Sequence, residues 1–87
     1  MRKECLLPAD QGWECPTGDE IRKVLKLANL SGSEAAKVLG LHISSSRNSG
    51  GRTIRRWTSG ETAIPYAAWA ILCDLAGFGQ IWWDSTD

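Results

Sequence analysis

Histidine and cysteine are scarce in this 87-residue chain. His42 is the single histidine, and the three cysteines are Cys5, Cys15 and Cys73. An odd number of widely spaced cysteines argues against a disulfide framework, and a zinc site would need paired ligands that this spacing does not supply. We interpret Cys73 as a small core residue of a helix and the other two as ordinary thiols. We therefore expect no metal and no other cofactor, and no special role for His42.

Long hydrophobic runs are also missing. The most apolar stretch, residues 64–76, is interrupted by Pro65, Tyr66 and Asp74, and it falls short of the ~20 residues that a membrane span needs. The first residues include two basic side chains but no sustained apolar core behind them, unlike a secretory signal. A cytoplasmic location is the resulting expectation.

Catalytic motifs are absent as well. The sequence has no carboxylate pair or nucleophile motif in a structural context that would support catalysis. Gly50-Gly51-Arg52-Thr53 places glycines before an expected helix, but it lacks the preceding strand and the lysine of a phosphate-binding loop. We expect that the protein is not an enzyme.

Charge is distributed unevenly, although the net charge is zero. Residues 1–19 carry a net charge of −2, residues 20–60 carry eight basic and two acidic residues, and residues 61–87 carry four acidic residues and no basic one. Because a phosphate backbone responds to a local basic patch, the middle of the chain indicates nucleic-acid binding. For Arg22, Lys23 and Lys26, a solvated helix face is an equally good interpretation.

The first half of the chain contains signals for two helices. Residues 1–17 hold several breakers and no sustained period, so we expect a flexible N-terminal segment ahead of a domain at 18–87. Thr17 and Glu20 fit a capping box at the start of a helix over 19–29. Ser31 or Ser33 can cap a second, short helix over 32–39, which Gly40 ends.

The second half contains signals for two more helices. Residues 42–51 form a polar loop rich in glycine and serine, and a helix follows over 52–58 with Ile54 and Trp57 on its inner face. Pro65 opens a helix over 65–76. We place Trp57 and Trp69 in the core. The apolar tail should pack on the bundle or on a partner. The sequence thus predicts an all-α, compact bundle of four to five helices.

Two motifs lie in the basic part of the chain. Residues 30–40, Leu-Ser-Gly-Ser-Glu-Ala-Ala-Lys-Val-Leu-Gly, and residues 52–60, Arg-Thr-Ile-Arg-Arg-Trp-Thr-Ser-Gly, are similar to the second and third helices of one family. With the Ile64-Pro65 that follows, the chain resembles the lambda-repressor-like (Cro/C1 or XRE) helix-turn-helix DNA-binding domains over about residues 20–77. It also resembles small regulators of phages and other mobile elements. The resemblance implies a sequence-specific transcriptional regulator, by default a repressor, whose recognition helix lies at 52–58.

The chain departs from the family in two places. The turn between the two motif helices is normally three to four residues long, whereas residues 42–51 form an extended turn. Gly32 stands where the family usually has a polar side chain that reaches a phosphate. A backbone N–H at the helix start can still make that contact.

Site residues follow from the resemblance and from the physics of groove recognition. Arg52 and Arg56 are expected to read bases, since arginine can hold guanine O6 and N7 with two hydrogen bonds; a solvated helix face is the alternative. Thr53 could contact a thymine methyl or a phosphate. The other residues expected to contact DNA, mainly its backbone, are Ser31, Gly32, Ser33, Lys37, Arg47, Arg55 and Ser59.

The expected partner is double-stranded DNA, bound by a homodimer at an inverted-repeat operator, because one small domain reads little sequence from one half-site. Trp82 and Trp83 could cap the core or contact a partner. The alternative is a protein–protein adaptor, or an antitoxin, built on a helix-turn-helix fold.

Overall fold

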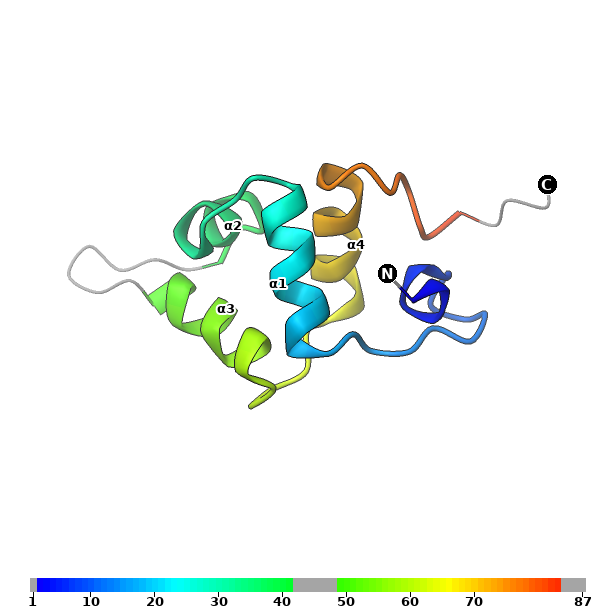
Figure 1. Cartoon of the computed structure of the whole chain (residues 1–87), viewed down its shortest axis with the longest axis horizontal. Helices are drawn as coiled ribbons and strands as arrows, with labels where there is room; N and C mark the ends of the chain where they lie inside the picture. Colours follow the sequence, from blue (N-terminus) through cyan, green and yellow to red (C-terminus); the bar gives the residue numbers. More distant parts are fainter. Residues whose placement is uncertain (1, 42–48, 84–87) are drawn as a thin grey trace.

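The chain is all-α in the computed structural model, which describes residues 2–41 and 49–83 (Figure 1). It contains a short 3-10 helix and four α-helices, and no strand occurs within those two ranges. The elements are η1 (Lys3–Leu6), α1 (Gly18–Leu27), α2 (Gly32–Val38), α3 (Ser49–Ser59) and α4 (Tyr66–Leu75). The expected all-α bundle is confirmed.

Helix α1 occupies the middle of the bundle. Helices α2 and α3 pack against each other on one side of it, and α4 packs on the other side (Figure 1). In the part of the chain that the structure describes, no helix combines the length and the apolar character needed to cross a bilayer.

The first two α-helices both begin with a capping box, which the sequence predicts for Thr17 and Glu20. The Thr17 hydroxyl accepts the Glu20 N–H at 3.2 Å, and the Glu20 carboxylate accepts the Thr17 N–H at 2.7 Å. Ser31 and Glu34 repeat the arrangement at 3.1 and 2.9 Å, so Ser31, not Ser33, caps α2. Each box satisfies N–H groups that a helix start leaves without partners.

All four α-helices end in the same way. After the last turn, a residue with positive φ directs the chain back, and the next N–H reaches the carbonyl five residues earlier. In α3 this residue is Gly60, with φ of 82°; the N–H of Glu61 donates to the Arg56 carbonyl at 2.9 Å, and the N–H of Gly60 to the Trp57 carbonyl at 3.2 Å. This is the Schellman pattern, in which glycine is favoured because it has no Cβ.

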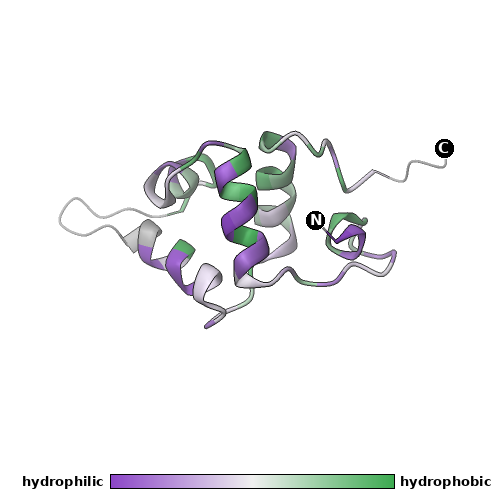
Figure 2. Cartoon of the chain, in the orientation of Figure 1, coloured by the Kyte–Doolittle hydropathy of each residue, from purple (hydrophilic) through white to green (hydrophobic). Residues whose placement is uncertain are grey.

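The core forms where the four helices turn their apolar faces inward. Helix α1 accordingly shows alternating hydrophobic and hydrophilic bands (Figure 2). Small residues on α2 allow it to approach α3 closely. The buried helical side chains are Ile21, Val24 and Leu25 of α1, Ala35 and Ala36 of α2, Ile54 and Trp57 of α3, and Trp69, Ala70, Leu72 and Cys73 of α4. The core positions predicted for Trp57, Trp69 and Cys73 are confirmed.

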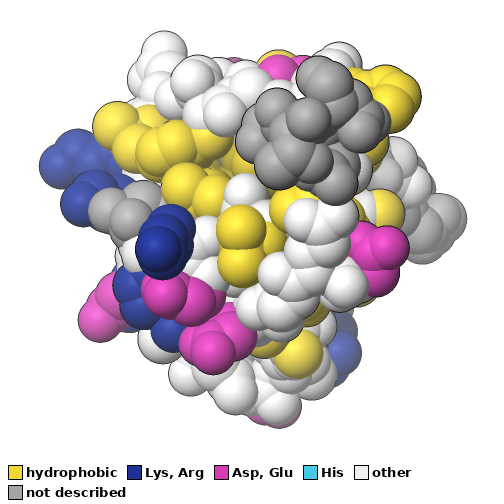
Figure 3. Space-filling view, turned by 90° about the vertical axis from the view of Figure 1, so that its right-hand side faces the viewer, with side chains coloured by type: hydrophobic (Ala, Val, Ile, Leu, Met, Phe, Trp, Pro, Cys, Tyr) yellow, Lys and Arg dark blue, Asp and Glu magenta, His cyan; other side chains and the backbone are white. Residues whose placement is uncertain are grey.

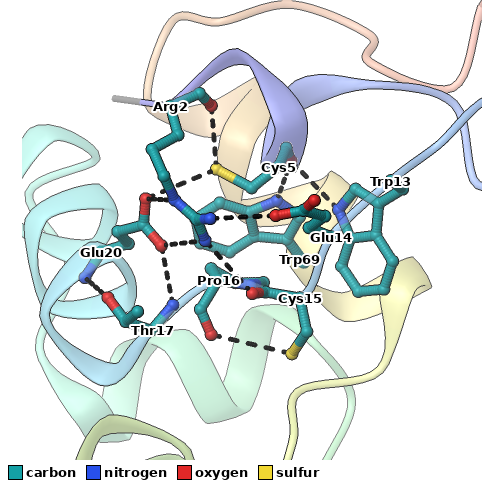
Figure 4. A network of polar contacts seen from close by, with 9 residues as sticks. All are labelled: Arg2, Cys5, Trp13, Glu14, Cys15, Pro16, Thr17, Glu20 and Trp69. Atoms are coloured by element: carbon teal, nitrogen blue, oxygen red, sulfur yellow. Dashed lines mark hydrogen bonds and ion pairs between the residues drawn. The ribbon is translucent and has the colours of Figure 1, made fainter.

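The N-terminal segment makes far more contacts than its sequence suggests. Cys5 is completely buried, and its carbonyl accepts the indole N–H of Trp69 at 2.6 Å and that of Trp13 at 3.1 Å (Figure 4). The Tyr66 hydroxyl donates to the Leu7 carbonyl at 3.0 Å. The structure therefore differs from the expected flexible segment, because side chains of α4 hold its backbone through hydrogen bonds.

An ion pair ties the same segment to the start of α1. The Arg2 guanidinium donates to both Glu20 carboxylate oxygens at 2.7 and 2.8 Å (Figure 4). These bonds from Arg2 are the largest reason that the pKa of Glu20 falls to about 2. A carboxyl group whose pKa is lowered by folding stabilises the fold at every pH above its ordinary pKa. This contribution disappears only as the pH falls toward 2. The pair is therefore charged throughout the neutral range.

Helix α3 begins earlier than expected. It starts at Ser49, so residues 49–51, predicted to be loop, are helical. Because glycine is a poor helix former, the sequence predicted a loop at Gly50-Gly51. The burial of Ile54 and Trp57 anchors the helix one turn later and offsets that cost. The rest of the predicted loop, with His42 and Arg47, lies outside the described residues.

Candidate nucleic-acid interface

Helix α3 has two chemically different faces. Ile54 and Trp57 point inward and are 3% and 6% exposed. The opposite side carries exposed polar residues at spacings of three, four and seven, which places them on one face of a helix. Together with Glu61 they line an open hollow of about 370 Å³; these residues are Arg52, Arg55, Arg56 and Ser59. The structure thus brings four of the predicted site residues together.

A second hollow, of about 340 Å³, lies between α3 and the start of α2. It is lined by Ser31, Gly32 and Ser33 on one side and by Ile54, Arg55 and Thr58 on the other, with Leu25 beneath them. Arg55 lines both hollows. The outward face of α3 and the first turn of α2 therefore form one polar surface, joined at Arg55.

The first turn of α2 combines a closed cap with accessible backbone. Ser31 is already used by the capping box, and its N–H is the main cause of the lowered pKa of Glu34. The N–H of Gly32, at the first helical position, has no acceptor within the helix. A Cβ on Gly32 would lie 3.8 Å from Ile54 Cγ2, so the residue faces α3 at ordinary contact distance.

The arginines of α3 differ in their partners from the other two arginines that the structure describes, Arg2 and Arg22. Arg2 is paired with Glu14 and Glu20, and Arg22 with Asp19. Within residues 2–41 and 49–83, no such ion pair involves Arg52, Arg55 or Arg56. Their charges face solvent, with Glu61 as the one carboxylate that lines their hollow among the described residues. Such a surface suits a polyanion, because the binding partner supplies the missing counter-charge.

Of the remaining predicted residues, two line neither hollow and one is not among the residues that the structure describes. Thr53 is half-buried and lines neither hollow. Lys37 is exposed in the last turn of α2 and also lines neither. Arg47 is not among the described residues. Sequence reasoning missed Glu61 as a lining residue, and also Thr58, whose place depends on the packing of α1 against α3.

Comparison with known proteins gives two curated relatives. Both are named transcriptional repressor protein KorC, and both come from Escherichia coli. Each is 57% identical to this chain over 82 residues, which cover 94% of the chain and 89% of the relative. No family model matches the chain, and no solved structure does. Identity at this level over nearly the whole length shows that the chain belongs to the family of the KorC transcriptional repressors.

Proposed function

We propose that the chain represses transcription by binding double-stranded DNA at a specific sequence, with α2 and α3 acting as a helix-turn-helix of the lambda-repressor-like kind. The observation that carries this proposal is the polar surface in which Arg52, Arg55 and Arg56 lie together beside the first turn of α2. The names of the two relatives support repression of transcription. On this proposal the protein acts without catalysis, in the cytoplasm, where the DNA of a bacterium lies.

The geometry suggests a role for each group. The major groove admits one helix, and α3 would enter it with Arg52 and Arg56, one turn apart, directed at base edges. Arg55 would hold a phosphate together with the N–H groups at the start of α2, where the helix dipole also favours an anion. Ser59, Thr53, Lys37 and Arg47 would add contacts to the DNA backbone or bases.

The first test is the selection of bound duplexes from a random pool at moderate salt. We expect the wild type to enrich an inverted repeat, and we expect Arg52→Ala/Arg56→Ala to lose the enrichment. Each bidentate contact to guanine is worth about 1–3 kcal/mol, so the double variant should bind the operator at least roughly 30-fold more weakly.

The matched control is Lys23→Ala/Lys26→Ala. It also removes two positive charges from exposed helical positions, but from α1 and away from the two hollows. We expect it to enrich the same repeat as the wild type. If the wild type enriches no sequence, specific DNA binding is contradicted, and a protein–protein adaptor or antitoxin becomes the better interpretation.

We further propose that two copies associate through α4 and the segment after it. This region exposes large apolar side chains around a groove of about 280 Å³ lined by Tyr66, Ala67, Ala70, Ile71 and Trp82. Hydrophobic patches are visible on the end of the molecule that carries η1 and the segment after α4 (Figure 3). Exposed apolar patches mark interaction surfaces. Because α4 lies across α1 from α3, such a contact would leave α3 available to DNA (Figure 1).

Sedimentation tests the dimer. We expect the wild type to sediment as a dimer at high micromolar concentration, and Ile71→Glu/Trp83→Glu to sediment as a monomer, because charge on an apolar contact prevents its burial. Leu27→Glu is the control, since Leu27 is also exposed but lies on α1. A wild type that stays monomeric, both alone and with operator DNA, would refute this arrangement.

A further inference from the structure

We propose that Arg22 of α1 is a positioning residue for base reading, because it fixes the C-terminal end of α3. This inference rests on the proposed function and adds to it a residue that lines neither hollow and was expected to be either a solvated cation or a nucleic-acid contact. Its basis is one hydrogen bond between two helices, from the Arg22 guanidinium to the Thr58 carbonyl at 2.7 Å.

The end of α3 leaves this carbonyl to be satisfied from elsewhere. The last four carbonyls of a helix have no donor within the helix. The Schellman turn serves the carbonyls of Arg56 and Trp57. The Thr58 carbonyl instead accepts Nη1 of Arg22, 36 residues away in the chain. A cation at this end also complements the helix dipole. Arg22 therefore serves a third carbonyl at the end of α3, from another helix.

The guanidinium is itself held in place. Its Nη2 donates to the carboxylate of Asp19, one turn earlier in α1. The backbones are also in close contact, since a Cβ on Gly18 would lie only 2.0 Å from the Thr58 carbonyl oxygen. Gly18 and Arg22 of α1 thus meet the last turn of α3 at a single carbonyl, and Asp19 holds the guanidinium that reaches it. The Arg2–Glu20 ion pair also holds the first turn of α1.

This contact is well placed to influence base reading. Thr58 lines the hollow beside Arg55, and its hydroxyl donates to the Arg55 carbonyl at 3.1 Å. Arg55 and Arg56 therefore belong to the turn that Arg22 holds. Bidentate contacts to guanine need accurate placement of the helix, whereas phosphate contacts carry no sequence information. Loss of Arg22 should therefore weaken operator binding more than binding to random duplex.

The test compares Arg22→Gln with Lys23→Gln. Both remove one positive charge from adjacent, exposed positions of α1. Affinity is measured for the selected operator and for a random duplex over a range of salt concentrations. We expect Arg22→Gln to lower the ratio of operator to random affinity about tenfold with an unchanged salt slope, and Lys23→Gln to leave the ratio unchanged. Equal loss on both duplexes, with a log–log salt slope reduced by about 0.9, would identify Arg22 as a phosphate contact and overturn the proposal.

A second readout does not depend on DNA. The carbonyl ¹³C resonance of Thr58 in the free protein should shift in Arg22→Gln and stay in place in Lys23→Gln. An unchanged resonance in Arg22→Gln would show that the hydrogen bond does not exist and would overturn the proposal, even if operator binding is confirmed. If the wild type selects no operator, the proposed function fails and the role in base reading fails with it, whereas a shifted resonance would still establish the cap.

Discussion

Replacement of Trp69 with alanine is expected to lower the free energy of unfolding by about 3–5 kcal/mol, the usual cost of truncating a buried tryptophan. Trp69 is fully buried, and its indole N–H donates to the Cys5 carbonyl at 2.6 Å. The variant would lose both the filled volume and this link between α4 and the N-terminal segment. A chain of this length has a total stability of about 4–13 kcal/mol, so the variant should be close to unfolding.

Denaturant unfolding followed by circular dichroism measures the effect. Trp83→Ala is the matched control, because Trp83 is 64% exposed and its truncation should change the unfolding free energy by no more than about 0.5 kcal/mol. Trp69→Phe keeps an aromatic ring but removes the donor, so we expect a smaller loss. If Trp69→Ala and Trp83→Ala unfold at the same denaturant concentration, the N-terminal segment and α4 do not share the core described here.

The four α-helices could be predicted because their signals are local. A capping box spans only four residues, so it can be recognised without knowledge of the rest of the fold. The two boxes here are Thr17 with Glu20 and Ser31 with Glu34. The inner faces follow from apolar spacing, as for Ile54 and Trp57. The predicted helix ends accordingly differ from the structure by few residues, except at the start of α3.

The N-terminal segment could not be predicted from such signals. Side chains of Trp13, Tyr66 and Trp69 hold it by donating to backbone carbonyls, two of them from α4. Every residue has a carbonyl, so the acceptor leaves no mark in the sequence. The Arg2–Glu20 ion pair is equally hidden, because Glu20 is already accounted for by the capping box.

The candidate site also has a part that could be predicted from the sequence and a part that could not. The spacing of Arg52, Arg55 and Arg56 is enough to place them on one face, as the structure has them. The position of Arg55 between the two hollows depends on how α2 packs on α3. In the sequence, nothing distinguishes Arg22 from the other two cations of α1, Lys23 and Lys26. Its contact with Thr58 arises from the approach of α1 to α3.

Replacement of Gly18 with alanine is expected to have the second large effect, because it acts on that approach. An added Cβ would lie 2.0 Å from the Thr58 carbonyl oxygen and 2.8 Å from the Thr58 carbonyl carbon. Both atoms belong to the backbone and cannot rotate away, so α1 and α3 must separate. Overpacking of this kind costs about 1–3 kcal/mol, occasionally more. The separation should also break the hydrogen bond from Arg22, and the Thr58 carbonyl resonance would report that loss.

Gly32→Ala provides the control, because Gly32 is the first residue of α2 as Gly18 is of α1. Its Cβ would meet only Ile54 Cγ2, at 3.8 Å, an ordinary contact with a side chain. The alanine also restricts the unfolded chain, so we expect a gain of about 0.4–1 kcal/mol in unfolding free energy. The two variants should therefore change stability in opposite directions. If Gly18→Ala is instead as stable as Gly32→Ala, the two backbones are not in contact, and the close approach that places Arg22 at the end of α3 would have to be abandoned.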